Sequence, residues 1–183
     1  SSVGVGKSVS AGTLSLSGAQ SSNYTLVGGT HTIDVNPRTT NASGTRHYDG
    51  TTTAGSSTFS TFSNSVGGDT ITLSGSGSIA SSGVGSKGVT IGSLQSAHPN
   101  YILGNATLTV TKRPVSLTGS RLQGGTTNVL ASELSFSNLA NSETLVLSGQ
   151  GTIPEMRIGS HLLNLFSLSM SNGTGNTSNY TFT

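Results

Sequence analysis

The chain contains no cysteine and no tryptophan, and only 8% of its 183 residues are charged. Without cysteine it can form neither a disulfide nor a thiolate zinc site. Its basic residues are scattered, whereas a nucleic-acid surface needs clustered positive charge and aromatic platforms. No apolar stretch approaches the roughly 18 residues that a membrane-spanning helix requires. We therefore expect no nucleic-acid partner and no membrane insertion.

What remains is a polar chain of low charge. Hydrophobic residues make up 31%, with 26 glycines, only 4 prolines and a net charge of +2. Disorder normally needs low hydrophobicity combined with a high net charge, which this sequence does not have. Folded β structure is the expectation, with a thin core that neighbouring repeats or subunits help to stabilise.

The sequence repeats itself. Three Asn-Tyr pairs are spaced 77 and 79 residues apart. They are Asn23-Tyr24, Asn100-Tyr101 and Asn179-Tyr180. A second block, residues 70–79, reappears as residues 144–153 in the same order. Solenoid repeats have periods of about 20 to 50 residues, and a longer unit can close its own core. The pattern predicts small domains arranged in tandem.

Two prolines that follow strand-like runs, Pro37 and Pro114, are the expected domain junctions because proline does not extend a central strand. The predicted division is residues 1–36 as the C-terminal part of a repeat, 37–113 as a complete repeat and 114–183 as a repeat that lacks its last strand. Domain junctions carry few contacts. We therefore expect proteases to cut first near Arg38 and near Lys112-Arg113.

Within a unit, apolar residues alternate with Ser and Thr, and Gly, Asn and Ser clusters intervene. This period of two is typical of half-buried antiparallel strands. The predicted fold class is mainly β, with tandem antiparallel β-sandwich (Ig-like) or β-grasp-like domains of about 77 residues. The sandwich is favoured over the β-grasp-like sheet. The best helix candidate is a single turn over residues 62–66, which align with residues 136–140.

Tyr48-Asp49-Gly50 is predicted to form a turn. The carboxylate of Asp49 can accept backbone N–H groups, Gly50 tolerates positive φ, and the ring of Tyr48 would pack on the core. The matching stretch of the next unit, residues 122–126, has neither the phenol nor the carboxylate, and its glutamine aligns with Asp49. A turn survives that change, so the motif is interpreted as structural rather than catalytic.

The Asn-Tyr pairs receive a structural interpretation too. Each asparagine would close a turn, and Tyr24, Tyr101 and Tyr180 would begin strands with their rings in the core and their hydroxyls at its edge.

Two glycine-rich segments imitate nucleotide-binding motifs. Gly6-Lys7-Ser8 resembles the end of a P-loop, and residues 83–88 match GxGxxG. Both motifs require a helix that receives the phosphate, but β-patterned runs follow here. The histidines and aspartates share no metal-ligand or triad spacing. We therefore predict no catalytic, cofactor-binding or metal-binding residues.

The Tyr-Asp-Gly-Thr-Thr segment at 48–52, the block at 68–75 and the Asn-Tyr-x-Leu strand followed by Thr-x-Thr-Val resemble the YDG-type repeat, a relative of the MBG repeat. Such repeats occur in arrays in large bacterial surface adhesins, including filamentous-haemagglutinin-like exoproteins. The resemblance implies an extracellular, cell-surface location, no enzyme activity and a role as a stalk or adhesive array. It supplies no receptor and no binding residues.

The leading functional hypothesis is a structural or adhesive segment of a bacterial surface protein. One alternative is a subunit of a self-assembling extracellular filament with strands shared between neighbours, and another is a glycan-binding module. The expected partners are neighbouring repeats or identical chains, head to tail, and a host or matrix surface. Because each end of the chain carries what the other lacks, we expect the terminal strands to be completed by residues outside the chain.

Overall fold

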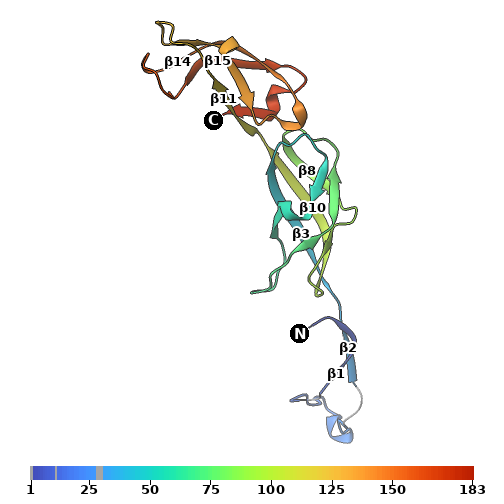
Figure 1. The fold of residues 1–183 in the computed structure, drawn as a ribbon. Helices are drawn as coiled ribbons and strands as arrows, with labels where there is room; N and C mark the ends of the chain where they lie inside the picture. The colour runs from blue at the N-terminus through green and yellow to red at the C-terminus, as the bar shows by residue number, and fades with distance from the viewer. Residues whose placement is uncertain (1, 11, 28–30) are drawn as a thin grey trace.

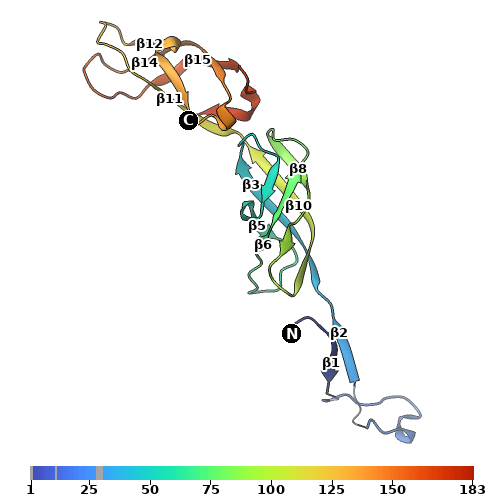
Figure 2. The ribbon, with the colours of Figure 1, turned by 45° about the vertical axis from the view of Figure 1, so that its right-hand side comes forward.

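The computed structural model describes residues 2–10, 12–27 and 31–183. The described chain is mainly β, as predicted, and its only helical elements are 3-10 turns of three residues each. Three parts follow one another along an extended line: an N-terminal hairpin, a middle unit and a C-terminal unit (Figure 1). A rotated view shows the same arrangement (Figure 2).

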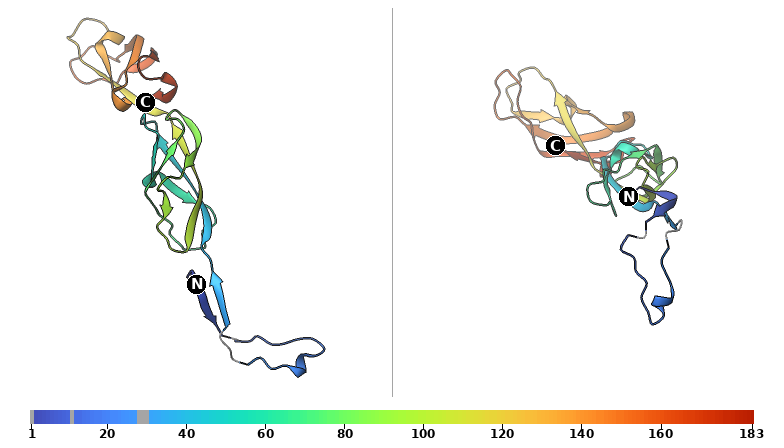
Figure 3. Two further views of the ribbon diagram at one scale, coloured as in Figure 1. Left: turned by 90° about the vertical axis from the view of Figure 1, so that its right-hand side faces the viewer. Right: turned by 90° about the horizontal axis from the view of Figure 1, so that it is seen from below.

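The N-terminal part is a two-stranded antiparallel ribbon of β1 (Gly4–Val9) and β2 (His31–Val35). A long connection joins the two strands, and it includes the 3-10 turn η1 (Ser21–Asn23). The described residues 12–27 of this connection extend away from the rest of the molecule (Figure 3). The ribbon has little core of its own, since most of its apolar side chains are exposed.

The middle unit contains a six-stranded sheet in the order β4-β7-β8-β10-β3-β5. Its strands are β3 (Arg38–His47), β4 (Thr53–Gly55), β5 (Phe59–Phe62), β7 (Ser76–Ile79), β8 (Gly85–Thr90) and β10 (Tyr101–Thr111). A small pair, β6 (Leu73–Ser74) and β9 (Gln95–Ser96), lies beside it, and the 3-10 turn η2 (Ser56–Thr58) connects β4 to β5. All of these strands lie between Arg38 and Thr111.

In the six-stranded sheet, one strand pair departs from the predicted antiparallel pattern, and in the C-terminal unit β11 (Arg113–Gly119) and β16 (Tyr180–Phe182) are also parallel although predicted antiparallel. β3 and β10 are parallel neighbours, whereas the other pairs of this sheet are antiparallel. Parallel neighbours need a long crossover connection, which is supplied here by all the chain between His47 and Tyr101. Sequence periodicity shows which residues face the core, but it does not reveal strand direction.

The core of the middle unit is built by alternation along β10. Ala106, Leu108 and Val110 are buried, while the residues between them are more exposed. Ala42 and Thr40 of β3 are buried beside them. The predicted period of two is confirmed in these strands.

The C-terminal unit contains two three-stranded sheets instead of one continuous sheet, with orders β13-β11-β16 and β12-β14-β15. Its elements are β11 (Arg113–Gly119), β12 (Asn128–Leu130), η3 (Ala131–Glu133), β13 (Leu134–Ser137), η4 (Ala140–Ser142), β14 (Leu145–Thr152), β15 (Asn164–Asn172), η5 (Thr177–Asn179) and β16 (Tyr180–Phe182).

Two glycines show that the middle and C-terminal units share a local architecture. A Cβ at Gly44 would collide with the backbone oxygen of Thr58, and a Cβ at Gly119 would collide with the backbone oxygen of Glu133. Each glycine therefore lets a 3-10 turn pass directly over a strand. The repeat predicted from sequence is thus visible as a repeated close approach of backbone.

The predicted helical turns are wrong. Residues 62–66 do not form a helix, because β5 extends to Phe62 and Asn64 adopts a left-handed conformation with φ 58°. The aligned stretch contains Asn138 at φ 57°, with η4 beginning only at Ala140. Left-handed asparagines make tight turns, and they interrupt a helix.

Candidate functional site

The middle and C-terminal units meet at two tyrosines that share one carboxylate. The hydroxyl of Tyr48 donates to Oε1 of Glu143, and the hydroxyl of Tyr180 donates to Oε2, each at 2.6 Å. The two rings meet edge to face, with centroids 5.5 Å apart and an interplanar angle of 80°. Both rings are buried. Hydrogen bonds to a charged acceptor are among the stronger ones, so this cluster holds the two units together.

Burial and the adjacent carboxylate both favour the neutral phenols. Desolvation by burial and the hydrogen bond to Glu143 raise the pKa of Tyr180 to about 12. The same two causes raise the pKa of Tyr48 above its usual value. A phenolate beside Glu143 would place two negative charges in a poorly solvated site. The junction is therefore built for protonated tyrosines.

Asp49 organises the turn that carries Tyr48, as predicted. Its Oδ1 accepts hydrogen bonds from the backbone N–H and the hydroxyl of Thr51, both at 2.9 Å. Its Oδ2 lies 2.9 Å from Nη1 of Arg46. The same guanidinium donates to the backbone oxygens of Thr51 and Thr53, each at 2.5 Å. The carboxylate is engaged in structure, as the turn interpretation requires.

Gly50 also has the conformation predicted for it, with φ 75°. A Cβ at this position would collide with the side-chain amide of Asn141 in η4. The left-handed backbone favours glycine here, and a Cβ would in addition force the side chain of Asn141 to move. The Tyr-Asp-Gly turn is thus part of the contact surface between the units.

The asparagine of the third Asn-Tyr pair makes another contact between units. Oδ1 of Asn179 accepts a hydrogen bond from the backbone N–H of Val84 at 3.1 Å. Oδ1 of Asn100 accepts in the same way from the backbone N–H of Val3 at 3.0 Å. In both cases the donor belongs to the part that precedes the asparagine's own unit. This asparagine therefore fastens each unit to the one before it.

The tyrosine of the second pair repeats the chemistry of Tyr180. Tyr101 begins β10, is buried, and donates to Oδ2 of Asp69 at 2.7 Å while accepting from the backbone N–H of Val66 at 2.8 Å. Tyr180 likewise begins β16 and accepts from the backbone N–H of Ala140 at 3.2 Å. For these two tyrosines the predicted role is confirmed.

The prediction for Tyr24 is wrong, although Asn23 ends the 3-10 turn η1 as predicted. Tyr24 is 70% exposed and lies outside any strand, and Asn23 donates to the side chain of Gln20 at 2.6 Å. The physical reason is the environment. Tyr101 packs beside β3 of its own unit, whereas the described N-terminal part contains only β1 and β2. A tyrosine without a sheet to cover stays in solvent.

The structure also corrects one alignment. Arg121 repeats the bonds of Arg46, because its guanidinium donates to the backbone oxygens of Thr126 and Asn128. Gly125, with φ 71°, therefore corresponds to Gly50, and Gly124 rather than Gln123 corresponds to Asp49. The C-terminal unit keeps the arginine and the left-handed glycine of the turn but loses its carboxylate. The turn does not depend on the acid alone.

Sequence reasoning missed two carboxylates that accept hydrogen bonds from tyrosine hydroxyls, Glu143 at the junction and Asp69 inside the middle unit. One signal was available, since the Ser142-Glu143 and Gly68-Asp69 pairs align in the repeat and both end in an acid. In a chain with only six acidic residues, an acid retained in both copies points to a partner.

The two glycine-rich segments at 4–9 and 85–90 form the equivalent strands β1 and β8.

The junction formed by Tyr48, Glu143 and Tyr180 is a contact between the middle and C-terminal units. In the part of the chain that the structure describes, no group of three or more His, Cys, Asp or Glu side chains is placed to hold a metal ion. Within the same part, no helix is long and apolar enough to cross a membrane.

The model of the YDG domain family matches residues 31–110. The match includes the Tyr48-Asp49-Gly50 turn and extends from the beginning of β2 almost to the end of β10. No curated protein and no solved structure matches the chain.

Proposed function

We propose that this chain is a structural segment of an extracellular bacterial adhesin or surface fibre, in which YDG-type units project or connect functional parts located elsewhere. The observation that carries the proposal is the junction itself. Tyr48, Glu143 and Tyr180 belong to two successive units and are buried or half-buried where they meet. A shared carboxylate fixes the angle between units more firmly than a free linker would.

The backbone at the junction supports the same proposal. β10 ends at Thr111 and β11 begins at Arg113, so a single residue separates the last strand of one unit from the first strand of the next. Arg113 adds a hydrogen bond from its Nη1 to the backbone oxygen of Tyr48 at 3.3 Å. A nearly continuous strand transmits tension directly, which suits a stalk.

For the fold of each complete unit, we infer a β-grasp-like sheet in preference to an Ig-like sandwich. The Ig-like alternative consists of two packed antiparallel sheets. The middle unit instead has one large curled sheet that includes a parallel β3–β10 pair. The helix expected of such a unit is replaced by short 3-10 turns.

The location can be tested on the bacterium that produces the chain. Antibodies raised against residues 38–183 should label intact cells, and immunogold electron microscopy should place the label outside the outermost membrane. Labelling only after the cells are permeabilised would refute a surface role. An antibody against a cytoplasmic protein serves as the control for cell integrity.

A further inference from the structure

The chain enters the middle unit at one end of a strand ladder and leaves it at the other end. β2 ends at Val35 and β3 begins at Arg38, while β10 ends at Thr111 and β11 begins at Arg113. β3 and β10 are parallel neighbours, and both run along the line on which the three parts follow one another (Figure 2). Tension along the chain therefore acts on the start of β3 and on the end of β10.

The two positions that receive the tension lie at opposite ends of the ladder. Arg38 pairs with Tyr101 at the beginning of β10, and Thr111 pairs with His47 at the end of β3. Pulling Arg38 and Thr111 apart slides one strand along the other, so the hydrogen bonds between the strands share the force. Two strands that are pulled apart at the same end of a ladder lose their bonds one at a time. The parallel order of β3 and β10 therefore gives the more resistant of these two geometries.

Further hydrogen bonds extend the ladder at both ends. The backbone N–H of Arg38 donates to the backbone oxygen of Asn100 at 2.8 Å. At the other end, the backbone N–H of Tyr48 donates to the backbone oxygen of Thr111 at 2.9 Å. The hydroxyl of Thr111 donates to the backbone oxygen of Arg46 at 3.2 Å. Both strand ends that receive the tension are thus held by bonds beyond the paired residues.

A bulge and the core oppose sliding of the two strands. The register of β10 against β3 shifts between Leu103 and Ala106. Within this bulge, the backbone N–H of Asn105 donates to Oδ1 of Asn41 on β3 at 3.0 Å. Farther along β10, Leu108 is fully buried. Sliding would separate Asn41 from the bulge and would remove Leu108 from its place in a close-packed core.

The ladder also lies inside the sheet. β8 pairs with the other edge of β10, and β5 pairs with the other edge of β3. Water competes with backbone hydrogen bonds wherever it reaches them. Neighbouring strands on both sides limit that access, so the bonds between β3 and β10 are better protected than those of an edge strand.

We infer that the β3–β10 pair is a mechanical clamp, which makes the middle unit resist tension along the chain far better than force in other directions. The C-terminal unit begins the same arrangement, since β11 pairs in parallel with β16 and Arg113 lies opposite Tyr180 as Arg38 lies opposite Tyr101. The inference rests on the proposed function only for the source of the tension. The resistance belongs to the unit and can be measured on the purified chain.

Single-molecule pulling of the full chain in two directions tests the clamp. Two introduced cysteines can carry the handles, because the sequence has none of its own. Asn36→Cys with Lys112→Cys pulls the ladder along its length, and Thr45→Cys with Lys112→Cys opens it from one end. All three positions are exposed. At the same loading rate, the unfolding force should be at least about twofold higher in the first direction. Equal forces, or a higher force in the second direction, would overturn the inference.

A pair of matched core variants then locates the resistance. Leu108 in β10 and Ile79 in β7 are buried in the same unit, and their replacement by alanine removes the same number of carbon atoms. Leu108→Ala should lower the force in the first direction more than Ile79→Ala does. Equal losses would contradict a clamp formed by β3 and β10. If Leu108→Ala does not fold by circular dichroism, the comparison of the two directions decides, because it leaves the core intact.

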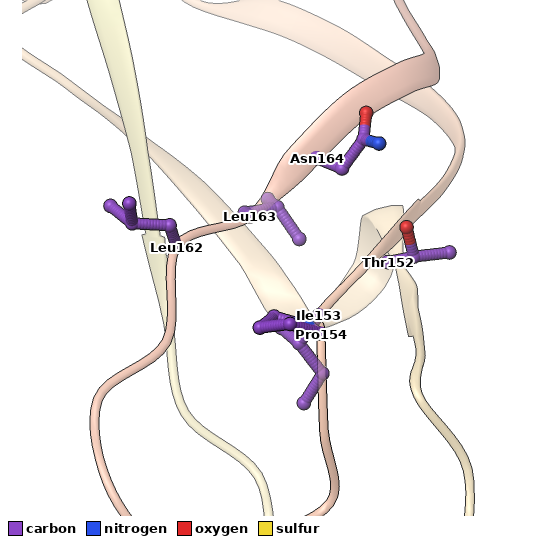
Figure 4. Close-up of a pocket in the computed structure, with 6 residues that line it drawn as sticks. All are labelled: Thr152, Ile153, Pro154, Leu162, Leu163 and Asn164. Carbon is purple, nitrogen blue, oxygen red and sulfur yellow. The ribbon is translucent and has the colours of Figure 1, made fainter.

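A variant in the other unit is the control for general stability. Leu163 lines a small cavity with Ile153 at the base of the connection between β14 and β15 (Figure 4). Leu163→Ala alters packing outside the pulled segment and should leave both forces unchanged. A loss equal to that in Leu108→Ala would show that the force does not report the clamp. None of these results alters where antibodies label the cell, so the proposed function fails or stands separately.

Discussion

Tyr48 and Tyr180 lie edge to face, with ring centroids 5.5 Å apart, and donate to the two oxygens of one carboxylate, although Tyr180 comes 132 positions after Tyr48 in the sequence. Tyr48 directly follows β3 of the middle unit, and Tyr180 begins β16 of the C-terminal unit. Glu143 joins the two tyrosines in a single cluster. The relationship explains why the turn that carries Tyr48 is built so firmly by Asp49 and Arg46. The turn presents a side chain to another unit.

Removing the hydroxyl of Tyr48 should destabilise the chain. Tyr48→Phe keeps the ring contact but deprives Glu143 of one of its two phenol donors, and the free energy of unfolding should fall by about 1.5 to 3 kcal/mol. Urea unfolding followed by circular dichroism measures this change. Tyr24→Phe is the control, because Tyr24 is exposed and should tolerate the change within about 0.5 kcal/mol. Equal effects of the two substitutions would show that the hydroxyl of Tyr48 contributes nothing.

Gly50 and Gly125 form a matched pair for testing the contact with Asn141. Both have positive φ, so Gly→Ala should cost about 1 to 2 kcal/mol at each from backbone strain. At Gly50 the new Cβ also meets Asn141, whereas nothing lies within 4 Å at Gly125. We therefore expect Gly50→Ala to be more destabilising by about 1 to 3 kcal/mol.

Combining Gly50→Ala with Asn141→Ala should recover most of that difference in a double-mutant cycle, because the truncated side chain no longer meets the new Cβ. If the two glycines respond alike and Asn141→Ala changes nothing, the turn does not pack against η4 as described.

Asp49→Gln should destabilise less than Gly50→Val, because Arg46 retains its bonds to the backbone of the turn.

Alkaline pH should weaken the junction. The pKa of Tyr180 in the folded chain is raised to about 12, against about 10 for an unfolded tyrosine. The folded state therefore binds the phenolic proton more tightly. This contribution to stability is complete below about pH 10 and is lost as the pH rises through about 12. Tyr48, whose pKa is raised in the same direction, adds to the effect.

Urea unfolding at a series of pH values from about 8 to 12 measures this loss. A double variant, Tyr48→Phe with Tyr180→Phe, should show a much shallower decline. Identical pH profiles for the wild type and the double variant would mean that these two phenols do not carry the alkaline sensitivity.

Limited proteolysis should begin in the C-terminal unit. The sequence alone places the first tryptic cuts near Arg38 and Lys112-Arg113, but both positions adjoin strands that run almost continuously from one part to the next. Arg157 is exposed in the segment that connects β14 to β15, outside any strand. Trypsin should therefore cut at Arg157 before Lys112, as mass spectrometry of early fragments would reveal. First cleavage at Lys112 would contradict this prediction and show that the junction between the units is the most accessible site.

Local patterns in the sequence predict the parts of this fold that depend on neighbouring residues. Alternation along β10, the left-handed Gly50 and the buried Tyr101 and Tyr180 all follow from the residues nearby. The parallel pairing of β3 with β10 does not, because strand direction depends on where the chain returns after a long crossover. The role of Glu143 could not be predicted for a related reason. Its partners Tyr48 and Tyr180 come from two units that only the folded chain brings together.

The cysteine-free sequence permits the most direct measurement of how the units are coupled, because two introduced cysteines would be the only sites for spin labels. Thr61→Cys in β5 and Ser135→Cys in β13 place labels on exposed positions of the two units. Double electron–electron resonance, with the labelled chain diluted in unlabelled chain, gives the distribution of distances between them. We expect one narrow distribution in the otherwise wild-type chain and a broad one in Tyr48→Ala. A broad distribution in the wild type, or one that Tyr48→Ala leaves unchanged, would contradict a junction held by Tyr48, Glu143 and Tyr180.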